Sequence, residues 1–345
     1  MQPLIKACAK TTCMTQELTA NKLEIPEQVR SAYQIGEDVT VERLHGGLVN
    51  DTLLVQSEEH AIVLRRLSNV MHADVLADTQ TVSDHLITQG WEAPTNLRTT
   101  EGALHVVDEA GFTWHSMNFI PSDGRTPQPS PDLPAAAGDL LGSWHASMRS
   151  LDYQPRFGLQ HFHDTPFHAS KLIDSLPEQS SAARELAHSI LRSYVTLPAD
   201  VEMSRQLIHG DPKLDNMLFR DGKPFTLIDF DTIMKDSVWT DVGDFLRSLT
   251  GKLLTTEGAE AGISDFVSAY REAGNVALSP DHAAHQALRH TGRIALELGM
   301  RYLCDIVDDQ NYFSWSVERF ATRQDNHLER AQLQLDVSQY VIGRL

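Results

Sequence analysis

The chain has 345 residues, of which 41% are hydrophobic and 22% are charged, ordinary proportions for a globular protein. Lysine and arginine number 29 against 47 aspartates and glutamates, which gives a net charge of −18. Such acidity excludes general binding to nucleic acid or to an anionic membrane. Any phosphate must be held by a local basic or amide-lined pocket or by a metal ion. The length suits two lobes better than a single core.

Residues 1–26 are expected to form a flexible N-terminal extension. They carry Lys6 and Lys10, no acidic residue before Glu17 and no apolar core of a secretory signal, which favours an extension over a weak transit peptide. No apolar run in the sequence is long enough to predict a membrane span. The three cysteines form no metal-binding pattern, and we expect a cytoplasmic protein without structural disulfides.

Residues 27–116 are predicted to form an N-terminal lobe of antiparallel strands with one helix. Alternating apolar residues predict strands within 39–67, a helical period covers 73–89, and 103–120 has the pattern of a hairpin with its turn at 109–111. Residues 117–134, rich in proline and serine, are expected to form a hinge and linker.

Residues 135–345 are predicted to form a mainly helical lobe. Long or amphipathic helical patterns cover 135–151, 167–195, 283–307 and 318–341. The predicted fold class is therefore α+β, with an antiparallel sheet in the first lobe and helices in the second.

One segment of the helical lobe is different: LIHGDPKLDNMLFRDGKPFTLIDFDTIM, residues 207–234. Asn216 follows Asp211 by five positions, and Asp229 and Asp231 end an apolar, strand-like run. A carboxylate can orient a hydroxyl and accept its proton, while an amide oxygen and a second carboxylate are hard ligands for magnesium. Phosphoryl transfer needs these groups, and H-x-D-x-x-x-x-N is the spacing of the kinase catalytic loop. The agreement of the two motifs disfavours the alternative, a capped polar loop with solvated carboxylates.

This segment resembles the aminoglycoside phosphotransferase and choline-kinase-like superfamily, the small-molecule relatives of the protein kinases. H-G-D stands where protein kinases have H-R-D, and I-D-x-D stands in place of D-F-G. The resemblance implies a protein-kinase-like fold of two lobes that uses ATP and Mg²⁺. It implies that Asp211 is the catalytic base and that Asn216 and Asp229 are magnesium ligands. Asp231 would be a further metal ligand or a substrate contact.

Two further residues are implied to support this loop. His209 is expected to brace the loop rather than to carry a proton. Asp241, in WTDVGDFLR, resembles the aspartate that hydrogen-bonds the catalytic loop from below.

A phosphate-binding turn is expected in LHGGLVNDTLLV, residues 44–55, between two predicted strands. Gly46 and Gly47 would let backbone N–H groups approach phosphates, although the pair could also form a simple hairpin turn. Similarity to the G-x-I-N-D-T loop of N-acetylhexosamine 1-kinases adds Asn50 and Thr52 to the nucleotide site.

The third strand of such relatives carries a cation that contacts the nucleotide phosphates. The segment AIVLRR offers Arg65 or Arg66 and no lysine. Adjacent strand residues face opposite sides, so at most one points inward, and the family register favours Arg65. On the following helix Asp78 is favoured over Asp74 and Asp84 as its ion-pair partner, in place of the usual glutamate.

The segment WHSMNFIPSDG is implied to be the hinge between the lobes. The backbone from Met117 to Phe119 would bind the adenine edge, and Trp114 would be a core residue. An ordinary last strand of the sheet is equally compatible with these residues.

Three patterns are similar to N-acetylhexosamine 1-kinases: GGLVNDT, FHDTP, and ELGMRYLCDIVDDQNYF followed by DNHLERAQLQL. The order Asn326-His327 departs from the family order His-Asn, and H-G-D stands where some members have H-N-D, so the sugar stays open. His163 and Asp164 either belong to the site or cap a helix. Trp315 could stack on a sugar face, although a core aromatic is more common.

A stripe on one late helix supplies the expected substrate contacts. Glu297 and Arg301 are one helical turn apart and can face the same cleft, and Asp305 continues the stripe. A surface row of salt bridges is the alternative, and the resemblance favours Arg301 as a substrate contact.

The sequence therefore predicts an ATP- and Mg²⁺-dependent kinase of a small, sugar-like molecule, with neither nucleic acid nor membrane as partner. The favoured acceptor is the anomeric hydroxyl of an N-acetylhexosamine or a related sugar. One alternative is another acceptor on the same fold: an aminoglycoside, choline, homoserine or methylthioribose. The other is a silent nucleotide-binding pseudokinase, suggested by the absent strand lysine and helix glutamate.

Overall fold

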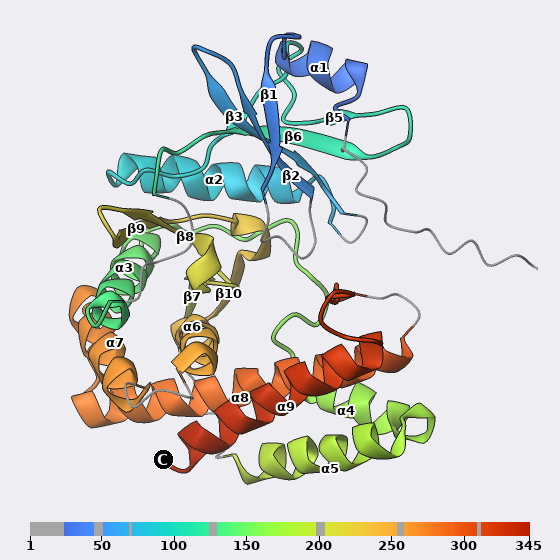
Figure 1. Cartoon of the computed structure of the whole chain (residues 1–345). Helices are drawn as coiled ribbons and strands as arrows, with labels where there is room; N and C mark the ends of the chain where they lie inside the picture. The colour runs from blue at the N-terminus through green and yellow to red at the C-terminus, as the bar shows by residue number, and fades with distance from the viewer. Residues whose placement is uncertain are drawn as a thin grey trace, which may run out of the picture.

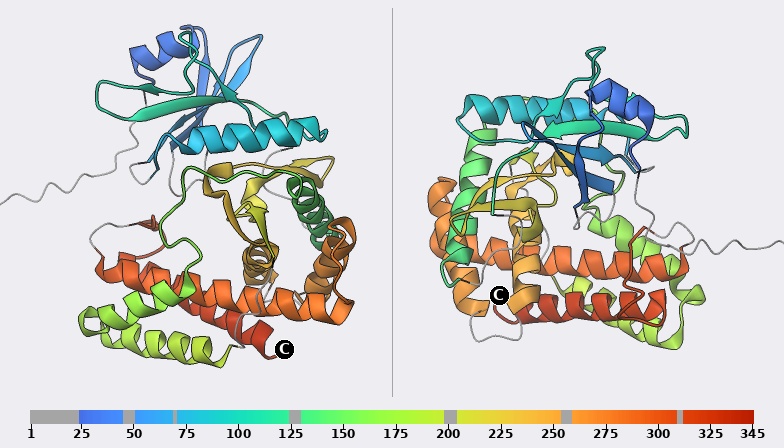
Figure 2. Two further views of the ribbon diagram at one scale, coloured as in Figure 1. Left: turned by 180° about the vertical axis from the view of Figure 1, so that it is seen from behind. Right: turned by 45° about the horizontal axis from the view of Figure 1, so that its top comes forward.

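The computed structural model describes residues 24–44, 51–68, 71–123, 130–197, 204–253, 259–308 and 312–345. Figure 1 shows an upper part, made of a sheet and two helices, and a larger, mainly helical lower part, and the rotated views in Figure 2 show the same division. Within these residues no helix combines the length and the apolar character that crossing a bilayer requires.

The upper part is built on an antiparallel sheet of six strands within the described residues. The strand order is β1 (Thr40–Arg43), β2 (Asp51–Gln56), β3 (Ala61–Arg66), β6 (Thr113–Asn118) and β4 (Asn96–Leu97), and β5 (Val106–Val107) pairs with the start of β6. The hairpin expected at 103–120 is confirmed, with Gly111 at a φ of +86° in its turn. Apolar residues of the strands pack with Val29 of α1 (Glu27–Tyr33).

Helix α2 (Val75–Thr88) lies between the sheet and the lower part in Figure 1. The stripe predicted for this segment is confirmed, because its buried residues include Val75, Leu76, Thr79, Val82 and Leu86. The helix packs against the short 3-10 helix η3 (Phe230–Thr232), so the two parts of the molecule meet at the segment predicted to bind metal.

Helices make up most of the lower part. They are α3 (Leu133–Met148), α4 (Thr165–Ser175), α5 (Ser181–Thr196), α6 (Val238–Leu253), α7 (Ala259–Ala273), α8 (Pro280–Val307) and α9 (Arg323–Ile342). The pattern over 167–195 is interrupted by η1 (Leu176–Glu178), where Pro177 cannot continue the hydrogen bonding of a helix interior. The largest core cluster includes Trp144, Trp239, Phe245 and Phe266, which α3, α6 and α7 bring together.

Two small antiparallel ribbons position the loops between these parts. β7 (Arg205–Ile208) pairs with β10 (Met234–Ser237), and β8 (Met217–Arg220) pairs with β9 (Lys223–Leu227). This pairing places the loop from 209 to 216, which ends in η2 (Leu214–Asn216), beside the residues that follow β9. The α+β class with an antiparallel sheet and a mainly helical second lobe is confirmed.

Candidate active site

The loop after β7 is held by a buried carboxylate from α6. Asp241 accepts hydrogen bonds from the backbone nitrogens of His209 at 2.7 Å and Gly210 at 2.8 Å, and His145 contacts its other side at 3.0 Å. Burial opposes the charge of Asp241, but the hydrogen bond of His145 and the charges of His145 and His209 bring its pKa below the usual value. The contact expected from Asp241 to this loop is therefore present.

Glycine is required at position 210. Gly210 has a φ of +86°, and a Cβ there would lie 2.3 Å from the carbonyl oxygen of Thr232. A larger residue would push the loop away from η3, because both the backbone conformation and the space exclude a side chain. This is the physical reason for H-G-D in this chain.

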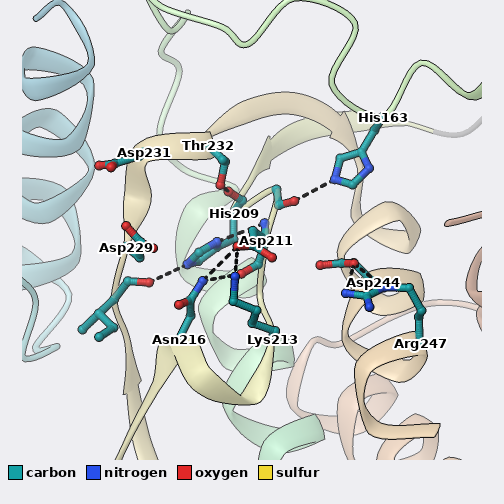
Figure 3. A network of polar contacts seen from close by, with 12 residues as sticks. His163, His209, Asp211, Lys213, Asn216, Asp229, Asp231, Thr232, Asp244 and Arg247 are labelled. Carbon is teal, nitrogen blue, oxygen red and sulfur yellow. Dashed lines mark hydrogen bonds and ion pairs between the residues drawn. The ribbon is translucent and has the colours of Figure 1, made fainter. Parts of the chain in front are cut away.

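His209 ties the loop to the end of β9. Its Nε2 donates to the carbonyl oxygen of Ile228 at 3.0 Å, and its Nδ1 lies 3.3 Å from the backbone nitrogen of Asp211. Both contacts are visible in Figure 3. A fully buried histidine with both ring nitrogens engaged suits the bracing role predicted for it, and that role stays a prediction.

Asp211 lies among polar groups from its own loop. Lys213 Nζ is 2.5 Å from Asp211 Oδ2, and the amide nitrogen of Asn216 donates to the carbonyl oxygen of Asp211 at 2.8 Å and to its Oδ2 at 3.2 Å. Burial raises the pKa of Asp211, the negative charges of Asp244 and Asp229 add to the rise, and Lys213 offsets part of it. A carboxyl group with a raised pKa is a better proton acceptor than an ordinary aspartate.

Arg65 is the arginine of β3 that points toward this loop. Its Nη2 lies 2.8 Å from Oδ1 of Asp229 and 2.9 Å from Oδ2 of Asp231, and its side chain is 7% exposed. Arg66 faces the other side of the strand, where it pairs with Asp51 at 2.5 Å. Arg65 is thus the arginine that faces the loop, and its contact with nucleotide phosphates stays a prediction.

The prediction that Asp78 pairs with Arg65 is wrong. Asp78 is 2% exposed and accepts hydrogen bonds from the hydroxyl of Tyr153 at 2.6 Å and from the backbone nitrogens of Arg156 and Phe157 at 2.8–3.1 Å. An aspartate is one methylene shorter than the usual glutamate, and this one reaches the segment after α3 instead. The guanidinium of Arg65 pairs instead with two carboxylates of the lower lobe, Asp229 and Asp231.

Asp229 has an unusual backbone conformation. Its φ of 71° and ψ of 57° are left-handed, a region that residues other than glycine adopt infrequently. The turn directs the chain from β9 into η3 and brings Asp229 and Asp231 to the same guanidinium. Figure 3 shows both aspartates on the side of the cluster away from His163.

A cavity of about 470 Å³ opens beside these residues. Asp211, Asp229 and Asp231 line one part of it, and Arg301 of α8 lines another. The guanidinium of Arg301 lies 5.3–5.4 Å from the ring centres of Phe162, Tyr312 and Phe313. Within the described ranges it forms neither an ion pair nor a hydrogen bond. The other lining residues include Met71, Leu159, His163, Lys213, Asp244, Arg247, Ile294, Glu297, Tyr302 and Arg330.

The stripe predicted on α8 is only partly directed at this cavity. Glu297 and Arg301 line it, whereas Asp305 does not. Asp305 accepts hydrogen bonds from the backbone nitrogens of Tyr312 at 2.8 Å and Phe313 at 3.2 Å, and it pairs with His327 at 2.8 Å. Burial opposes its charge, but these partners and Arg323 lower the pKa of Asp305 to about 2. Asp305 holds the aromatic segment in place, and together with Arg301 it lines a second cavity of about 310 Å³.

His163 and Asp164 have different surroundings. Asp164 caps α4 by accepting from the backbone nitrogen of Phe167 at 3.1 Å, while His163 lines the cavity. Trp315 is half-buried and does not line the cavity, so the structure gives no support for its stacking on a sugar there.

The residues predicted for nucleotide binding are only partly described. Gly46, Gly47 and Asn50 lie outside the described residues. Thr52 is buried on β2 directly opposite Arg65 in the strand register. Met117 lies in β6, paired with β3 and β4, and Phe119 follows the strand half-buried. Their nucleotide contacts stay predictions.

Several residues of the cavity were not identified from the sequence. Lys213 lies inside the HGDPK motif, and its position two residues after Asp211 was the available signal. Asp244 and Arg247 are paired at 2.6 Å one helical turn apart on α6, a helix that the sequence patterns did not predict. The aromatic wall comes from separate segments that no local pattern connects.

Comparisons with known proteins agree with this geometry. The chain matches the phosphotransferase enzyme family (APH) over residues 40–285. A solved structure of the amicoumacin kinase hAmiN in complex with AMP-PNP, Ca²⁺ and Ami is similar, with a TM-score of 0.63 and 14% identity over 91% of this chain and 92% of that one. A microcompartment-associated aminopropanol kinase has a TM-score of 0.60 and 18% identity over 92% of this chain and 96% of its own.

A choline kinase from Cryptosporidium parvum Iowa II is also similar, with a TM-score of 0.58 and 14% identity over 90% of this chain and 92% of that one. At such identities these structures establish the fold, which is the predicted fold of the kinase relatives. The family match covers most of the chain and includes the loop of Asp211 and the turn of Asp229. The chain therefore belongs to the phosphotransferase enzyme family, and the prediction of a phosphotransferase is confirmed.

Proposed function

We propose that the chain transfers the γ-phosphate of ATP, with Mg²⁺, to a hydroxyl of a small molecule, and that this acceptor is the anomeric hydroxyl of an N-acetylhexosamine or a related sugar. The observation that carries the proposal is the placement of Asp211 and Asp229 on one wall of the cavity that Arg301 and the aromatic rings also line. The donor side and the acceptor side of a transfer reaction thus share one space.

Asp211 orients the acceptor hydroxyl and takes its proton in this proposal. The raised pKa of Asp211 suits that task, and the ammonium group of Lys213 partly offsets the negative charge of Asp211. Substitution by asparagine keeps the shape of the side chain and removes its basicity. We expect Asp211→Asn to lower kcat at least about 1000-fold with little change in nucleotide affinity, since such a base contributes on the order of 10²–10⁴-fold.

Asn216 and Asp229 fit a magnesium site by their chemistry. The amide nitrogen of Asn216 donates to Asp211, which leaves its side-chain oxygen as the atom for a metal. No group of three or more His, Cys, Asp and Glu side chains in the described ranges is arranged to hold a metal. This is compatible with Mg²⁺, which is commonly held by one or two protein side chains together with substrate phosphates. When bound, the ion would neutralise phosphate charge.

The charges of the cavity favour a sugar over a cationic acceptor. Five of the carboxylates that line it have a cationic neighbour in the structure. Arg301 also occupies the aromatic faces that a quaternary ammonium group would need. The pairs are Asp211 with Lys213, Asp229 and Asp231 with Arg65, Asp244 with Arg247, and Glu297 with His163.

A silent nucleotide-binding protein is the second candidate, and one contact favours it. Arg65 lies 2.8 Å from Asp229, so a proposed metal ligand is bound by a guanidinium in this structure. Against it stands the completeness of the remaining groups, since Asp211, Asn216 and Lys213 form one connected cluster.

The test is ADP release with ATP and Mg²⁺ against N-acetylglucosamine, N-acetylgalactosamine, glucosamine, galactose, choline, homoserine and kanamycin. We expect turnover on an acetylated hexosamine, with the phosphate at C1 by ³¹P NMR. Turnover only on another member of the panel would overturn the sugar assignment and leave the role of Asp211 intact. Absence of turnover on every acceptor, combined with nucleotide binding measured by calorimetry, would favour a nucleotide-binding protein without catalytic activity.

A further inference from the structure

We infer that His163 is a positioning residue for the catalytic loop: its imidazole holds the carbonyl oxygen of Gly210, and Glu297 of α8 holds the imidazole. The inference rests on the proposed role of Asp211, because Gly210 is the residue directly before it. Family membership assigns no role to His163, and the sequence patterns did not distinguish it from a helix cap.

Three short contacts define the arrangement. His163 Nε2 lies 2.7 Å from the carbonyl oxygen of Gly210, a contact drawn in Figure 3. On the opposite side, His163 Nδ1 lies 3.3 Å from Glu297 Oε1, and the hydroxyl of Thr165 donates to Glu297 Oε2 at 2.6 Å. His163 is 9% exposed and Glu297 is 1% exposed, so little water competes for these groups.

The partners of the ring indicate its protonation. A carbonyl oxygen and a carboxylate can only accept hydrogen bonds, so both ring nitrogens face acceptors. Nε2 contacts the Gly210 carbonyl oxygen, whereas Nδ1 faces Glu297 at ion-pair distance without hydrogen-bond geometry, an arrangement that favours the imidazolium through charge. Burial opposes the positive charge of His163, but the close carboxylate of Glu297 raises the pKa of His163, with Asp244 and the Gly210 carbonyl adding to the rise. Burial likewise opposes the charge of Glu297, while His163 lowers the pKa of Glu297 to about 2.

The backbone of His163 is held in an uncommon conformation. Its φ is +58°, in the left-handed region that residues other than glycine adopt infrequently. Such a conformation persists where surrounding contacts determine it, and such residues are concentrated at functional sites. Here the conformation lets Asp164 cap α4 while His163 turns toward the cavity.

The contact acts on the peptide group that leads into Asp211. That group consists of the carbonyl of Gly210 and the N–H of Asp211. Its oxygen is held by His163 and its nitrogen lies 3.3 Å from His209 Nδ1. A peptide plane held at both ends cannot rotate, and its rotation would swing the carboxylate of Asp211 away from the acceptor. Displacement of a reacting group by about 1 Å can cost on the order of 100-fold in rate.

The experiment compares His163→Ala, Glu297→Gln and a control, His290→Ala, in the full chain. His290 is a 4% exposed histidine whose Nδ1 contacts a backbone carbonyl, that of Gln286, at 2.8 Å, and it does not line the cavity. We expect His163→Ala to lower kcat about 30- to 100-fold with the KM for ATP within about twofold. His290→Ala should lower the Tm and leave kcat within about twofold, because it removes only a structural contact.

Glu297→Gln separates the hydrogen bond from the charge. A glutamine can donate to Nδ1 of a neutral imidazole, whose Nε2–H still binds Gly210, so we expect only about a threefold loss in kcat, the scale of a weakened hydrogen bond. A kcat for His163→Ala within about threefold of wild type would overturn the inference, and so would an equal loss for His290→Ala at an equal drop in Tm.

Hydrogen–deuterium exchange keeps this test independent of the acceptor. His163→Ala should speed exchange in the peptide that covers 209–214 at least about fivefold, because local opening becomes easier. His290→Ala should leave that peptide unchanged. If the wild type transfers phosphate only to an acceptor other than a hexosamine, the sugar proposal fails. The kcat of wild type, His163→Ala and His290→Ala is then compared on that acceptor, so the inference about His163 is still tested. If no acceptor is found, unchanged exchange in His163→Ala refutes the inference, and faster exchange supports it.

Discussion

Two arginines of the same cavity have opposite surroundings. Arg65, on β3, is nearly fully buried and binds two carboxylates of the lower lobe. Arg301, on α8, lies among three aromatic rings and pairs with no carboxylate in the described part of the chain. A guanidinium paired with two carboxylates holds the structure together, whereas one without a carboxylate partner can bind a ligand.

In the proposed function, this difference divides the cavity into a phosphate-donor end and an acceptor end. At the donor end, Arg65 links the sheet to the residues after β9, in place of the strand lysine and helix glutamate of the family. At the acceptor end, Arg301 lies against the aromatic rings and presents hydrogen-bond donors to the cavity, which suits a hydroxylated ligand.

Removal of Arg65 should have a larger effect than removal of Arg301. Arg65→Ala leaves two neighbouring carboxylates without their cation, and we expect kcat/KM for ATP to fall about 100-fold or more. Arg65→Lys should recover only part of the lost kcat/KM, because a single ammonium group cannot bridge two carboxylates as the planar guanidinium group does. Steady-state kinetics with varied ATP provides the measurement. A lysine variant as active as wild type would show that the two-carboxylate contact of the guanidinium group is unnecessary.

Removal of Arg301 should act on the acceptor alone. We expect Arg301→Ala to raise the acceptor KM about 30-fold with the KM for ATP unchanged, since a charged hydrogen bond contributes about 1.5–3 kcal/mol. Arg344→Ala is the matched control, because Arg344 also lies over an aromatic ring, that of Tyr340, but donates to the carbonyl oxygen of Tyr340 at 2.8 Å and does not line the cavity. Equal effects of the two changes on acceptor KM would remove the distinction drawn for Arg301.

Asp305→Asn should lower the stability of the fold and leave kcat unchanged. We expect a loss of about 2 kcal/mol in the free energy of unfolding at pH 7, because the buried His327 and the partly buried Arg323 lose their carboxylate partner. The folded pKa of Asp305 is depressed to about 2, so this stability is present above pH 4 and is lost as the pH falls toward 2. Urea titrations at several pH values should show the two proteins converging in acid. A difference in the free energy of unfolding that stays constant down to pH 2 would contradict the contribution of the Asp305 charge to stability.

Lys213→Ala should have the smallest effect, a shift in the pH profile. Burial raises the pKa of Asp211 and Lys213 offsets part of that rise, so removing the lysine should raise the pKa further. The acid limb of kcat/KM should therefore move to higher pH. Lys213→Arg retains a cation and should leave the limb near its wild-type position. A shift to lower pH in the alanine variant would exclude this electrostatic role.

Local patterns accounted for much of the upper lobe and for the catalytic loop. The stripe of α2 and the hairpin ending in β6 depend on residues close in sequence, as does the spacing from Asp211 to Asn216. Their periods and turn residues are visible without knowledge of the fold. The interruption of the helix at Pro177 is also a local effect, although the helical pattern predicted over 167–195 did not include it.

From the sequence alone came the division into a sheet-based first lobe and a mainly helical second lobe, the candidate groups for phosphoryl transfer and the family to which they point. Only the tertiary structure decided the partners of those groups. Arg65 meets Asp229 and Asp231 across 164 and 166 residues, His163 meets Gly210 across 47, and Asp305 meets His327 across 22. A carboxylate is bound by whichever donor the fold brings within about 3 Å, and no period in the sequence encodes that distance.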